Sequence, residues 1–457
     1  MYFISKFAQK IEKDGYICRF NSLKNVPVFY KNELDAKLEE CLFDTECRSY
    51  GEEIEVLISE LERAKVIVPS PEFDESIIGA IRNCVKKPYP AILYILLTEK
   101  CNFACDYCFI ERHMNQAKTN VMTKEIALKA LDFYAAQISK DPDLFEDEKN
   151  ILFYGGEPLS NYDVLKFTAQ KIQEYIAIGK FPKKTNVSMV TNGAFITEEI
   201  AKELKSLNVS FSISLDGATP QANACRKYHN GKLAYDDIIK GLENAKSAGC
   251  ECGLSVTLSQ EALKEGNLLF DMIDKYQIKS MGFNILLTDS VYSVPEQYFV
   301  DVSQFIVDAF KIFREKGVYE DRIMRKVKAF VEHRLHFQDC AAEGGNQLVI
   351  APDGEVGLCH GYLSTRETFV TNVNNHDFDM TKDPVFLDWN KRTPFNMPQC
   401  QDCMALGVCG GGCALNAKAN GKSIWDLDER FCIHAKATLE FLIWDLFEQI
   451  TSDYSEE

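Results

Sequence analysis

Residues 91–317 alternate between short apolar runs and longer amphipathic stretches. The apolar runs predict strands at 91–97, 150–154, 186–190, 210–215, 252–258 and 282–287. The stretches between them predict helices near 124–138, 162–178, 198–207, 234–247 and 260–276. Strands that alternate with helices form a parallel sheet with the helices outside. The pattern therefore predicts an α/β fold, with a partial (β/α)6 barrel, similar to a TIM barrel, over residues 91–317.

The first 90 residues follow a different pattern, which predicts a small α+β domain. Alternating positions favour a short hairpin, and two amphipathic stretches favour helices. The expected elements are strands at 15–22, 26–30 and 66–68 and helices at 32–42 and 52–64. Pro69 and Pro71 are expected to end the regular structure of this domain.

The rest of the chain divides into a helical linker, a cysteine-rich segment and a terminal helix. The linker at 318–339 contains a predicted helix at 323–337. Residues 340–435 carry seven cysteines and are expected to form a loop-rich domain. Residues 436–457 comprise most of an amphipathic helix and a polar tail.

Cys101, Cys105 and Cys108 lie directly after the first predicted barrel strand, spaced C-x3-C-x2-C. A tight loop can direct three thiolates at one point, and thiolates are the ligands of iron–sulfur clusters. Three ligands are one fewer than usual, so a cubane cluster there would leave one iron open for a substrate or cofactor. The alternative is a group of cysteines that only pack in the core. Barrel chemistry sits at the carboxyl ends of the strands, where this loop lies.

This loop resembles the signature of the radical S-adenosylmethionine (SAM) enzymes, in which an aromatic residue, here Tyr107, precedes the third cysteine. The resemblance implies a [4Fe–4S] cluster whose open iron is chelated by the amino and carboxylate groups of SAM. It also implies one-electron cleavage of SAM to a 5'-deoxyadenosyl radical. That radical abstracts a hydrogen atom from an unactivated carbon.

The second barrel strand ends in a further motif, Gly155-Gly156-Glu157. Adjacent glycines let a ligand approach the backbone closely, and a carboxylate can accept hydrogen bonds from an ammonium group. By resemblance to the family, this motif holds the amino group of SAM's methionine.

Other strand ends resemble those that contact the ribose and methionine of SAM in the family. Asn192, Ser214 and Asp216 would supply hydrogen bonds. Arg226 lies where relatives carry an arginine that reaches the SAM carboxylate, a group that guanidinium binds in a bidentate manner. Each of these four residues could instead cap or turn the backbone.

The cysteine-rich segment carries Cys340, Cys359, Cys400, Cys403, Cys409, Cys413 and Cys432. A tetrahedral zinc site built from four of them is one possibility. A zinc site would give no role to the other three cysteines of this segment or to the cysteine loop at 101–108. The complete order, including Gly354 ahead of Cys359, resembles the SPASM extension of radical SAM enzymes. The resemblance then covers residues 91 to about 435.

In the SPASM pattern the ligand sets interleave, which implies three [4Fe–4S] clusters in all. Auxiliary cluster I would be held by Cys340, Cys359 and Cys413. Auxiliary cluster II would be held by Cys400, Cys403, Cys409 and Cys432. The first set has three thiolates and one open iron site, which Glu343, water or a substrate thiolate could fill. We hypothesise the substrate thiolate, because a metal deprotonates a bound thiol and would hold it beside the radical's target.

The composition sets limits on partners and compartment. The chain has 457 residues, a net charge of −17 and a pI near 5.0, which argues against nucleic acid or an anionic membrane as the main partner. Its start does not resemble a signal peptide, and no apolar run reaches membrane-span length. Seventeen cysteines without an export signal indicate metal ligation in a reducing, cytoplasmic environment.

These observations predict a radical SAM/SPASM enzyme that forms a thioether or carbon–carbon cross-link in a ribosomally made peptide. The domain at 1–90 resembles the winged-helix-like peptide-recognition domain of such maturases, where a leader peptide adds a strand to a sheet edge. A flavodoxin- or ferredoxin-type protein is the expected electron donor. The alternatives are a sulfatase-maturing enzyme, which shares the SPASM pattern, and a non-catalytic zinc-ribbon protein.

Overall fold

The computed structural model describes residues 2–44, 49–114 and 119–453. These residues divide into two compact units, each built from separate parts of the chain. The first unit comprises Met1–Lys86, Ile323–Cys340 and Lys391–Glu457, and the second comprises Lys87–Arg322 and Ala341–Asn390. The domain boundaries expected near residues 90, 317, 339 and 435 stay predictions.

The second unit is organised around one sheet, to which the described residues contribute ten strands. In spatial order these are β12 (Tyr319–Glu320), β11 (Ser280–Asn284), β10 (Cys252–Thr257), β9 (Val209–Ser214), β8 (Thr185–Thr191), β7 (Lys149–Tyr154), β6 (Ile92–Leu96), β13 (Gln347–Ile350), β14 (Glu355–Gly357) and β15 (Phe369–Asn372). Neighbours from β12 to β13 are parallel, and β14 and β15 are antiparallel additions. The chain therefore has an α/β fold with a large, mostly parallel sheet.

Strands β6 to β11 confirm the six strands expected from the apolar runs, with ends that differ by at most three residues. The sequence did not predict β12 to β15, which are two to four residues long and too short to show a period. As a result, the segment expected to be loop-rich contributes three strands to the large sheet. Together with β12 they make this sheet wider than the six strands expected.

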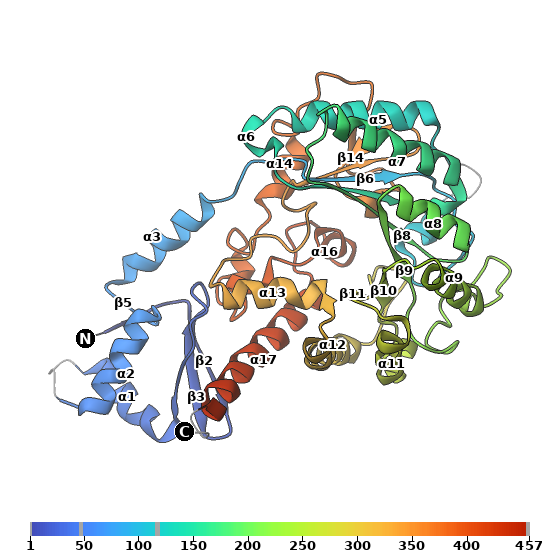
Figure 1. Ribbon diagram of the computed structural model, residues 1–457. Helices are drawn as coiled ribbons and strands as arrows, with labels where there is room; N and C mark the ends of the chain where they lie inside the picture. The colour runs from blue at the N-terminus through green and yellow to red at the C-terminus, as the bar shows by residue number, and fades with distance from the viewer. Residues whose placement is uncertain (1, 45–48, 115–118, 454–457) are drawn as a thin grey trace. The chain divides into compact units, whose positions relative to one another are not determined.

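Helices cover the outer side of this sheet, as Figure 1 shows. They include α5 (Lys124–Ile138), α7 (Tyr162–Ala177), α8 (Glu198–Ser206), α9 (Tyr235–Ser247) and α11 (Gly266–Tyr276). The helix expected over 260–276 is divided, because Glu265 leaves helical geometry between α10 (Gln260–Lys264) and α11. Helix α12 (Gln297–Lys316) was not predicted, and the linker helix α13 (Asp321–Val331) ends before the expected residue 337.

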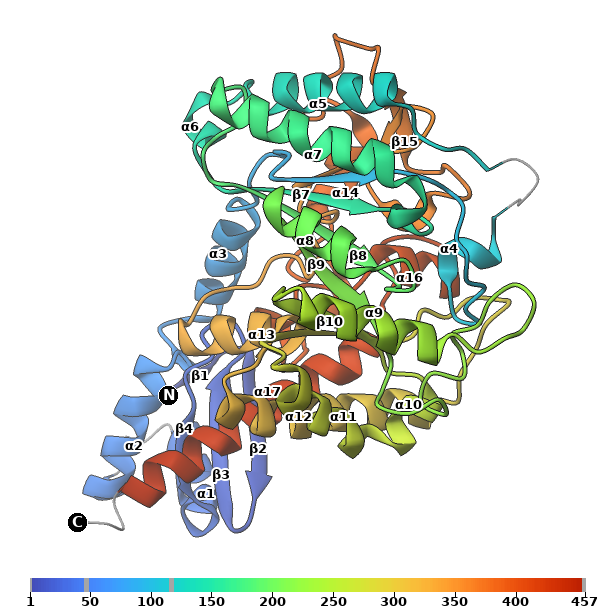
Figure 2. The same ribbon diagram turned by 45° about the vertical axis from the view of Figure 1, so that its right-hand side comes forward.

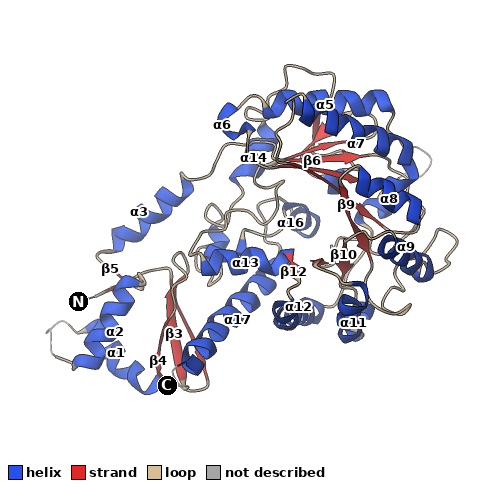
Figure 3. Cartoon of the chain, viewed as in Figure 1, coloured by secondary structure: helices blue, strands red, loops and turns tan. Residues whose placement is uncertain are grey.

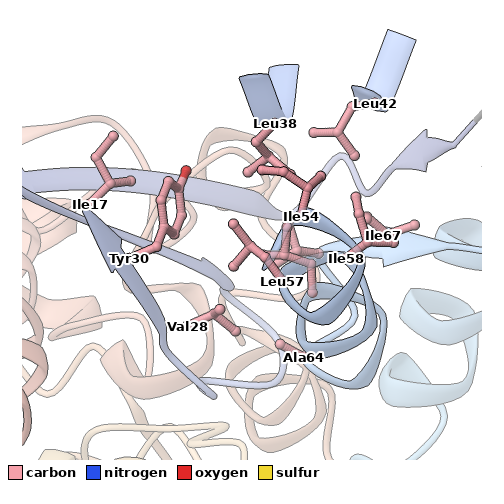
Figure 4. Packing of buried hydrophobic residues seen from close by; sticks show 12 residues of the cluster. Ile17, Val28, Tyr30, Leu38, Leu42, Ile54, Leu57, Ile58, Ala64 and Ile67 are labelled. Carbon is pink, nitrogen blue, oxygen red and sulfur yellow. The ribbon is translucent and has the colours of Figure 1, made fainter. Parts of the chain in front are cut away.

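The first unit contains a three-stranded antiparallel sheet with helices on both faces. Its strands are β2 (Ala8–Lys13), β3 (Tyr16–Asn21) and β4 (Val28–Lys31), in that order. Ile17 on β3 faces α1 (Asp35–Phe43) and α2 (Glu52–Arg63), whose apolar side chains form the cluster in Figure 4. Cys18 and Phe20 face the other way, onto the long helix α17 (Glu429–Asp453). Figure 2 shows α17 beside β2 and β3.

The hairpin of β3 and β4 and the helices α1 and α2 were predicted, but two features near them were not. Strands β2 and β1 (Phe3–Ile4) were missed, and β1 pairs with β5 (Ile67–Val68). The expectation that Pro71 ends the regular structure is wrong. Pro71 is the first residue of α3 (Pro71–Arg82), a position where its missing N–H costs nothing because a helix start leaves that donor unpaired.

The cysteine-rich part of the first unit is mostly irregular, as the loops in Figure 3 show. Its short elements are η5 (Pro398–Cys400), α15 (Leu406–Cys409) and α16 (Ala414–Asn420). Among the helices of the described residues, none combines the length and the apolar character that crossing a membrane requires.

Candidate active site

The loop that carries Cys101, Cys105 and Cys108 starts where β6 ends. Backbone hydrogen bonds hold it on two sides. The Gly156 N–H donates to the Thr98 carbonyl at 2.8 Å, which joins the loop to the end of β7. The Ala104 N–H donates to the Lys227 carbonyl at 2.7 Å, which joins it to the segment after β9. The three cysteines are therefore fixed at the carboxyl edge of the parallel sheet, as the sequence predicts.

The three thiols interact electrostatically with one another, and all three cysteines are half-buried. Burial raises the pKa of Cys101 well above its usual value and that of Cys105 to about 12, an effect that Arg226 opposes at Cys105. The Phe103 N–H donates to the Cys101 sulfur at 3.4 Å. Metal binding replaces the thiol protons, so buried thiols together with a donor to sulfur suit an iron–sulfur cluster.

Within the described ranges, no three His, Cys, Asp or Glu side chains converge closely enough to hold a single metal ion. A cubane cluster spreads its ligand sulfurs over a larger volume than one ion does, so this result concerns sites for a single ion.

Gly155 and Gly156 are required because the cysteine loop lies directly against them. Gly155 has φ of +128°, and a Cβ there would lie 2.3 Å from the Thr98 carbonyl oxygen. A Cβ on Gly156 would lie 2.2 Å from the Lys100 carbonyl oxygen. The sequence analysis expected a ligand to approach these glycines. In the structure the backbone that approaches them is that of residues 98–101.

Glu157 is buried, with 1 % of its surface exposed, and links the ends of two strands. Its carboxylate accepts hydrogen bonds from the Thr191 hydroxyl at 2.7 Å, the Asn192 N–H at 2.8 Å and the Leu159 N–H at 3.0 Å. None of these donors is a cation. Burial raises the pKa of Glu157 to about 7, although the hydrogen bonds oppose the shift.

Asp216, Arg226 and Tyr107 form one buried network beside the cysteines. Asp216 accepts hydrogen bonds from the Tyr107 hydroxyl at 2.6 Å and from Nη2 of Arg226 at 2.8 Å. It also accepts from the N–H of Thr257, at the end of β10, at 3.0 Å. The Arg226 guanidinium lies 5.5 Å from the centre of the Tyr107 ring, and its Nε is buried with no hydrogen-bond partner.

The other two predicted contact residues also lie at strand ends. The Asn192 side-chain amide donates to the Asn102 side-chain oxygen at 2.7 Å, so Asn192 touches the cysteine loop. Ser214 is the half-buried last residue of β9. The structure thus brings Tyr107, Asp216 and Arg226 into direct contact with one another. The contacts of these residues with a cofactor stay predictions.

Sequence reasoning missed an aromatic group in the same unit. The His360 ring stacks on Tyr94 at 4.6 Å and meets Tyr154 edge-on at 5.1 Å. Tyr94 and Tyr154 occupy the half-buried positions of β6 and β7, and His360 directly follows Cys359. The alternation along these strands could have identified the two tyrosines. His229, which the sequence analysis did not use, lies 3.0 Å from the Cys101 carbonyl oxygen.

Four of the SPASM-type cysteines interact within the first unit. The thiols of Cys400, Cys403 and Cys432 act electrostatically on one another, and Cys432 also acts on Cys409. This is the set expected to hold auxiliary cluster II. For the other set, Cys340 and Cys413 belong to the first unit and Cys359 to the second.

Buried charged groups support the loop around these cysteines. Asp428 accepts two hydrogen bonds from Arg430 and one from the Cys413 N–H at 3.0 Å. Arg392 has no exposed surface and donates to the carbonyl oxygens of Ile424 and, at 3.1 Å, Asp426. Gly410, Gly411 and Gly412 all have positive φ, which allows the tight turn between two cysteines.

Comparisons with known proteins agree with this geometry. Residues 95–269 match the family model of the Radical SAM superfamily. The radical SAM cyclopropyl synthase TigE of Paramaledivibacter caminithermalis is 26% identical over 371 residues, 77% of this chain and 73% of that protein. The cysteine-type anaerobic sulfatase-maturating enzyme of Clostridium perfringens is 22% identical over 68% of this chain and 85% of its own length.

Two solved structures share the fold. The structure of anSMEcpe with bound AdoMet has a TM-score of 0.65 at 19% identity and covers 79% of this chain and 96% of its own. Streptococcus suis SuiB bound to the precursor peptide SuiA has a TM-score of 0.55 at 16% identity and covers 94% and 100%. The match to the superfamily and the likeness to these proteins lead to one conclusion: residues 95–269 belong to the Radical SAM superfamily, and the chain resembles the SPASM-containing maturases of peptides and proteins.

Proposed function

We propose that this enzyme forms a thioether or carbon–carbon cross-link in a ribosomally made precursor peptide. Cys101, Cys105 and Cys108 would hold the cluster that binds SAM. When bound, this cluster and SAM supply a 5'-deoxyadenosyl radical that removes a hydrogen atom from the peptide. The observation that carries the proposal is the set of three half-buried cysteines at the carboxyl edge of the sheet, beside two buried polar positions.

The first of these positions is the Glu157 carboxylate. It is buried and is contacted by a hydroxyl and two N–H groups, so a cationic partner is missing from its surroundings. The ammonium group of SAM's methionine would supply that charge and favour ionised Glu157. The donor set therefore fits the amino end of the cofactor.

The second position is the buried Nε of Arg226, which has no partner. An unpaired buried donor is costly, and a carboxylate satisfies guanidinium well. Asp216 holds the guanidinium through Nη2, which leaves Nε available to the carboxylate of SAM. Tyr107 and the Thr257 N–H keep Asp216 in place. Asn192 and Ser214 would complete the contacts from neighbouring strand ends.

The cysteine-rich segment would hold two auxiliary clusters. Cys400, Cys403, Cys409 and Cys432 would bind auxiliary cluster II, and Cys340, Cys359 and Cys413 would bind auxiliary cluster I. Glu343, one candidate for the open site of auxiliary I, has no exposed surface. Substrate thiolate at that site remains our hypothesis. Precursor peptide should then perturb the auxiliary I spectrum, and a Cys-to-Ala peptide should not.

The three-stranded sheet of the first unit supports a peptide substrate. The likeness to SuiB, solved with its precursor peptide, extends over 94% of this chain. We propose that a leader peptide adds a strand to this sheet, because edge strands offer unpaired N–H and C=O groups. A flavodoxin- or ferredoxin-type protein would supply the electron.

The test uses the full chain with reconstituted clusters, a chemical reductant, SAM and a candidate precursor peptide, which is to be sought among short reading frames beside its gene. We expect about twelve irons per chain and 5'-deoxyadenosine formation, with loss of two hydrogen atoms per cross-link. Replacing Cys101, Cys105 and Cys108 together with Ala should remove one cluster and abolish 5'-deoxyadenosine. Cleavage of SAM at the wild-type rate by that triple variant would contradict the cofactor assignment.

A sulfatase-maturing activity is the second candidate, favoured by the TM-score of 0.65 to anSMEcpe. Such an enzyme would convert a Cys or Ser of a sulfatase to formylglycine. The product then carries an aldehyde, which an aminooxy reagent labels, whereas a cross-linked peptide is not labelled. Labelling of a sulfatase peptide, without modification of the neighbouring precursor, would favour this second activity.

A further inference from the structure

Lys326 is a lysine with no exposed surface, and it lies within the first unit. It belongs to α13, and its ammonium nitrogen is 3.2 Å from Oδ1 of Asp339, which is 4 % exposed. A buried ion pair is often no more stabilising than apolar residues of the same volume. Stability alone therefore does not explain this pair.

Two neighbours connect the pair to the expected ligands of auxiliary cluster II. The Asp339 N–H donates to the carbonyl oxygen of Gly410, the residue after Cys409, at 3.0 Å. The Lys326 ammonium lies 5.5 Å from the centre of the Phe431 ring, and Phe431 directly precedes Cys432.

Both charges act on Cys409, one of the expected ligands. Burial raises the pKa of the Cys409 thiol, and the charge of Lys326 opposes this increase. The charge of Asp339 adds to it, with a smaller effect than that of Lys326. Nη1 of Arg325 also lies 3.9 Å from Oδ2 of Asp339, so the group formed by Lys326, Arg325 and Asp339 carries a net positive charge.

A net positive charge changes the redox properties of a cluster. Reduction adds one electron, and therefore one negative charge, to a cluster that is already anionic because four thiolates bind it. A cation nearby stabilises the reduced form, and low dielectric strengthens the effect. Local charge and solvent exposure are among the factors that set iron–sulfur potentials.

We propose that Lys326 and Asp339 set the reduction potential of auxiliary cluster II, with Lys326 raising it and Asp339 limiting the rise. This inference rests on the proposed binding of a cluster by Cys400, Cys403, Cys409 and Cys432. A raised potential suits a cluster that takes part in a net oxidation. Lys326 is thus a tuning residue that acts through the cluster and does not contact the substrate.

The test is a potentiometric titration of the full, reconstituted chain, followed by electron paramagnetic resonance. The background carries the Cys101, Cys105 and Cys108 to Ala changes, so that only auxiliary signals remain. Lys326→Met should lower the equilibrium constant for reduction of auxiliary II at least tenfold, which is 59 mV for one electron. Asp339→Asn should shift it in the opposite direction, and Lys326→Arg should keep the wild-type value.

Lys436→Met is the matched control. Lys436 also acts on Cys400 and Cys432, but its side chain is exposed, so water and salt screen its charge. We expect little change in that variant. Equal potentials in wild type, Lys326→Met and Asp339→Asn, at unchanged iron content, would overturn the inference.

If Lys326→Met fails to retain the cluster, the reduction potential of auxiliary II in Asp339→Asn becomes the test. An unchanged or lower potential in that variant overturns the inference. Absence of any auxiliary II signal from the wild-type chain would instead refute the proposed cofactor content, and with it this inference. The two failures are therefore distinguishable.

Discussion

Asp216 is the residue on which the side chains beside the first cysteine loop converge. It accepts hydrogen bonds from a tyrosine, an arginine and a backbone N–H, and the last two contacts are buried. The sequence identifies Asp216, Arg226 and Tyr107 one by one, through their positions in motifs. That they contact one another depends on the turn after β9, where the Asn223 side chain accepts from the Asp216 N–H at 2.8 Å. No sequence pattern shows this turn.

We predict that Asp216→Asn lowers the unfolding free energy by about 3–5 kcal/mol, because it leaves the buried charge of Arg226 without its partner. Denaturant unfolding of the cluster-free chain measures this effect. In a double-mutant cycle with Tyr107→Phe, the two losses of unfolding free energy should be strongly non-additive, since both side chains belong to one network. Additive losses would show that Tyr107 and Asp216 act independently.

Glu157 should make stability depend on pH. Its pKa is raised to about 7 in the fold, against about 4.3 unfolded, so between these values the folded chain binds the proton more tightly. Wild-type stability then falls as pH rises from about 4.3 to 7, by up to about 1.4 kcal/mol per pH unit. Glu157→Gln removes this dependence.

The melting temperature of the cluster-free Glu157→Gln variant should therefore improve relative to wild type as the pH rises from 5 to 7. A difference in melting temperature that stays constant over this range would contradict the raised pKa.

At the scale of elements, the candidate site is built from strand ends and the loops that cross them. The period of the apolar runs locates β6 to β11 because each is long enough to show a pattern. The short strands β13 to β15 lack such a pattern, and their pairing is set by contacts distant in sequence. For the same reason, the sequence indicates the glycines after β7 but not the loop that packs on them.

We predict that Gly156→Ala prevents formation of the first cluster, because its Cβ would lie 2.2 Å from the Lys100 carbonyl oxygen and displace Cys101. Iron content should fall by about one third, with loss of 5'-deoxyadenosine formation, while the auxiliary spectra remain. Gly282→Ala, on β11 of the same sheet, is the control, because no atom lies within 4 Å of its added Cβ. Full iron content in Gly156→Ala would show that the loop can move aside.

At the scale of the whole molecule, the two units combine segments that are far apart in sequence. The sequence predicted a domain at 1–90 followed by a barrel and a cysteine-rich domain. In the structure, Ile323–Cys340 and Lys391–Glu457 form one compact unit with Met1–Lys86, and the predicted domain boundaries stay predictions. Local patterns locate helices and strands, but they carry no information on which distant segments share a core.

The proposed leader site should depend on β4 and not on β2. The outer edge of β2 carries charged residues such as Lys10 and Glu12, which discourage strand addition, whereas β4 is mostly apolar. Hydrogen bonds between antiparallel strands occur at alternate residues, and the N–H of Lys31 therefore points away from β3. The φ angle of Lys31, −71°, is one that proline adopts. Lys31→Pro should weaken peptide binding at least tenfold without affecting peptide-independent SAM cleavage.

Glu12→Pro, on the opposite edge, is the matched control and should leave peptide affinity unchanged. Calorimetry with the precursor peptide measures both variants. Weaker binding in Glu12→Pro alone would assign the leader to β2, and no change in either variant would mean that the leader does not add a strand to this sheet.

The packing of α17 on the N-terminal sheet has a consequence for how the protein is made. Strand β4 ends at Lys31, and α17 begins at Glu429, so the ribosome synthesises the sheet long before the helix that covers it. At ~5–20 residues per second, the delay is on the order of 20–80 seconds. During that time Cys18 and Phe20 lack their apolar partners on α17. Nascent chains, and products of premature termination, would therefore expose a hydrophobic sheet face to chaperones.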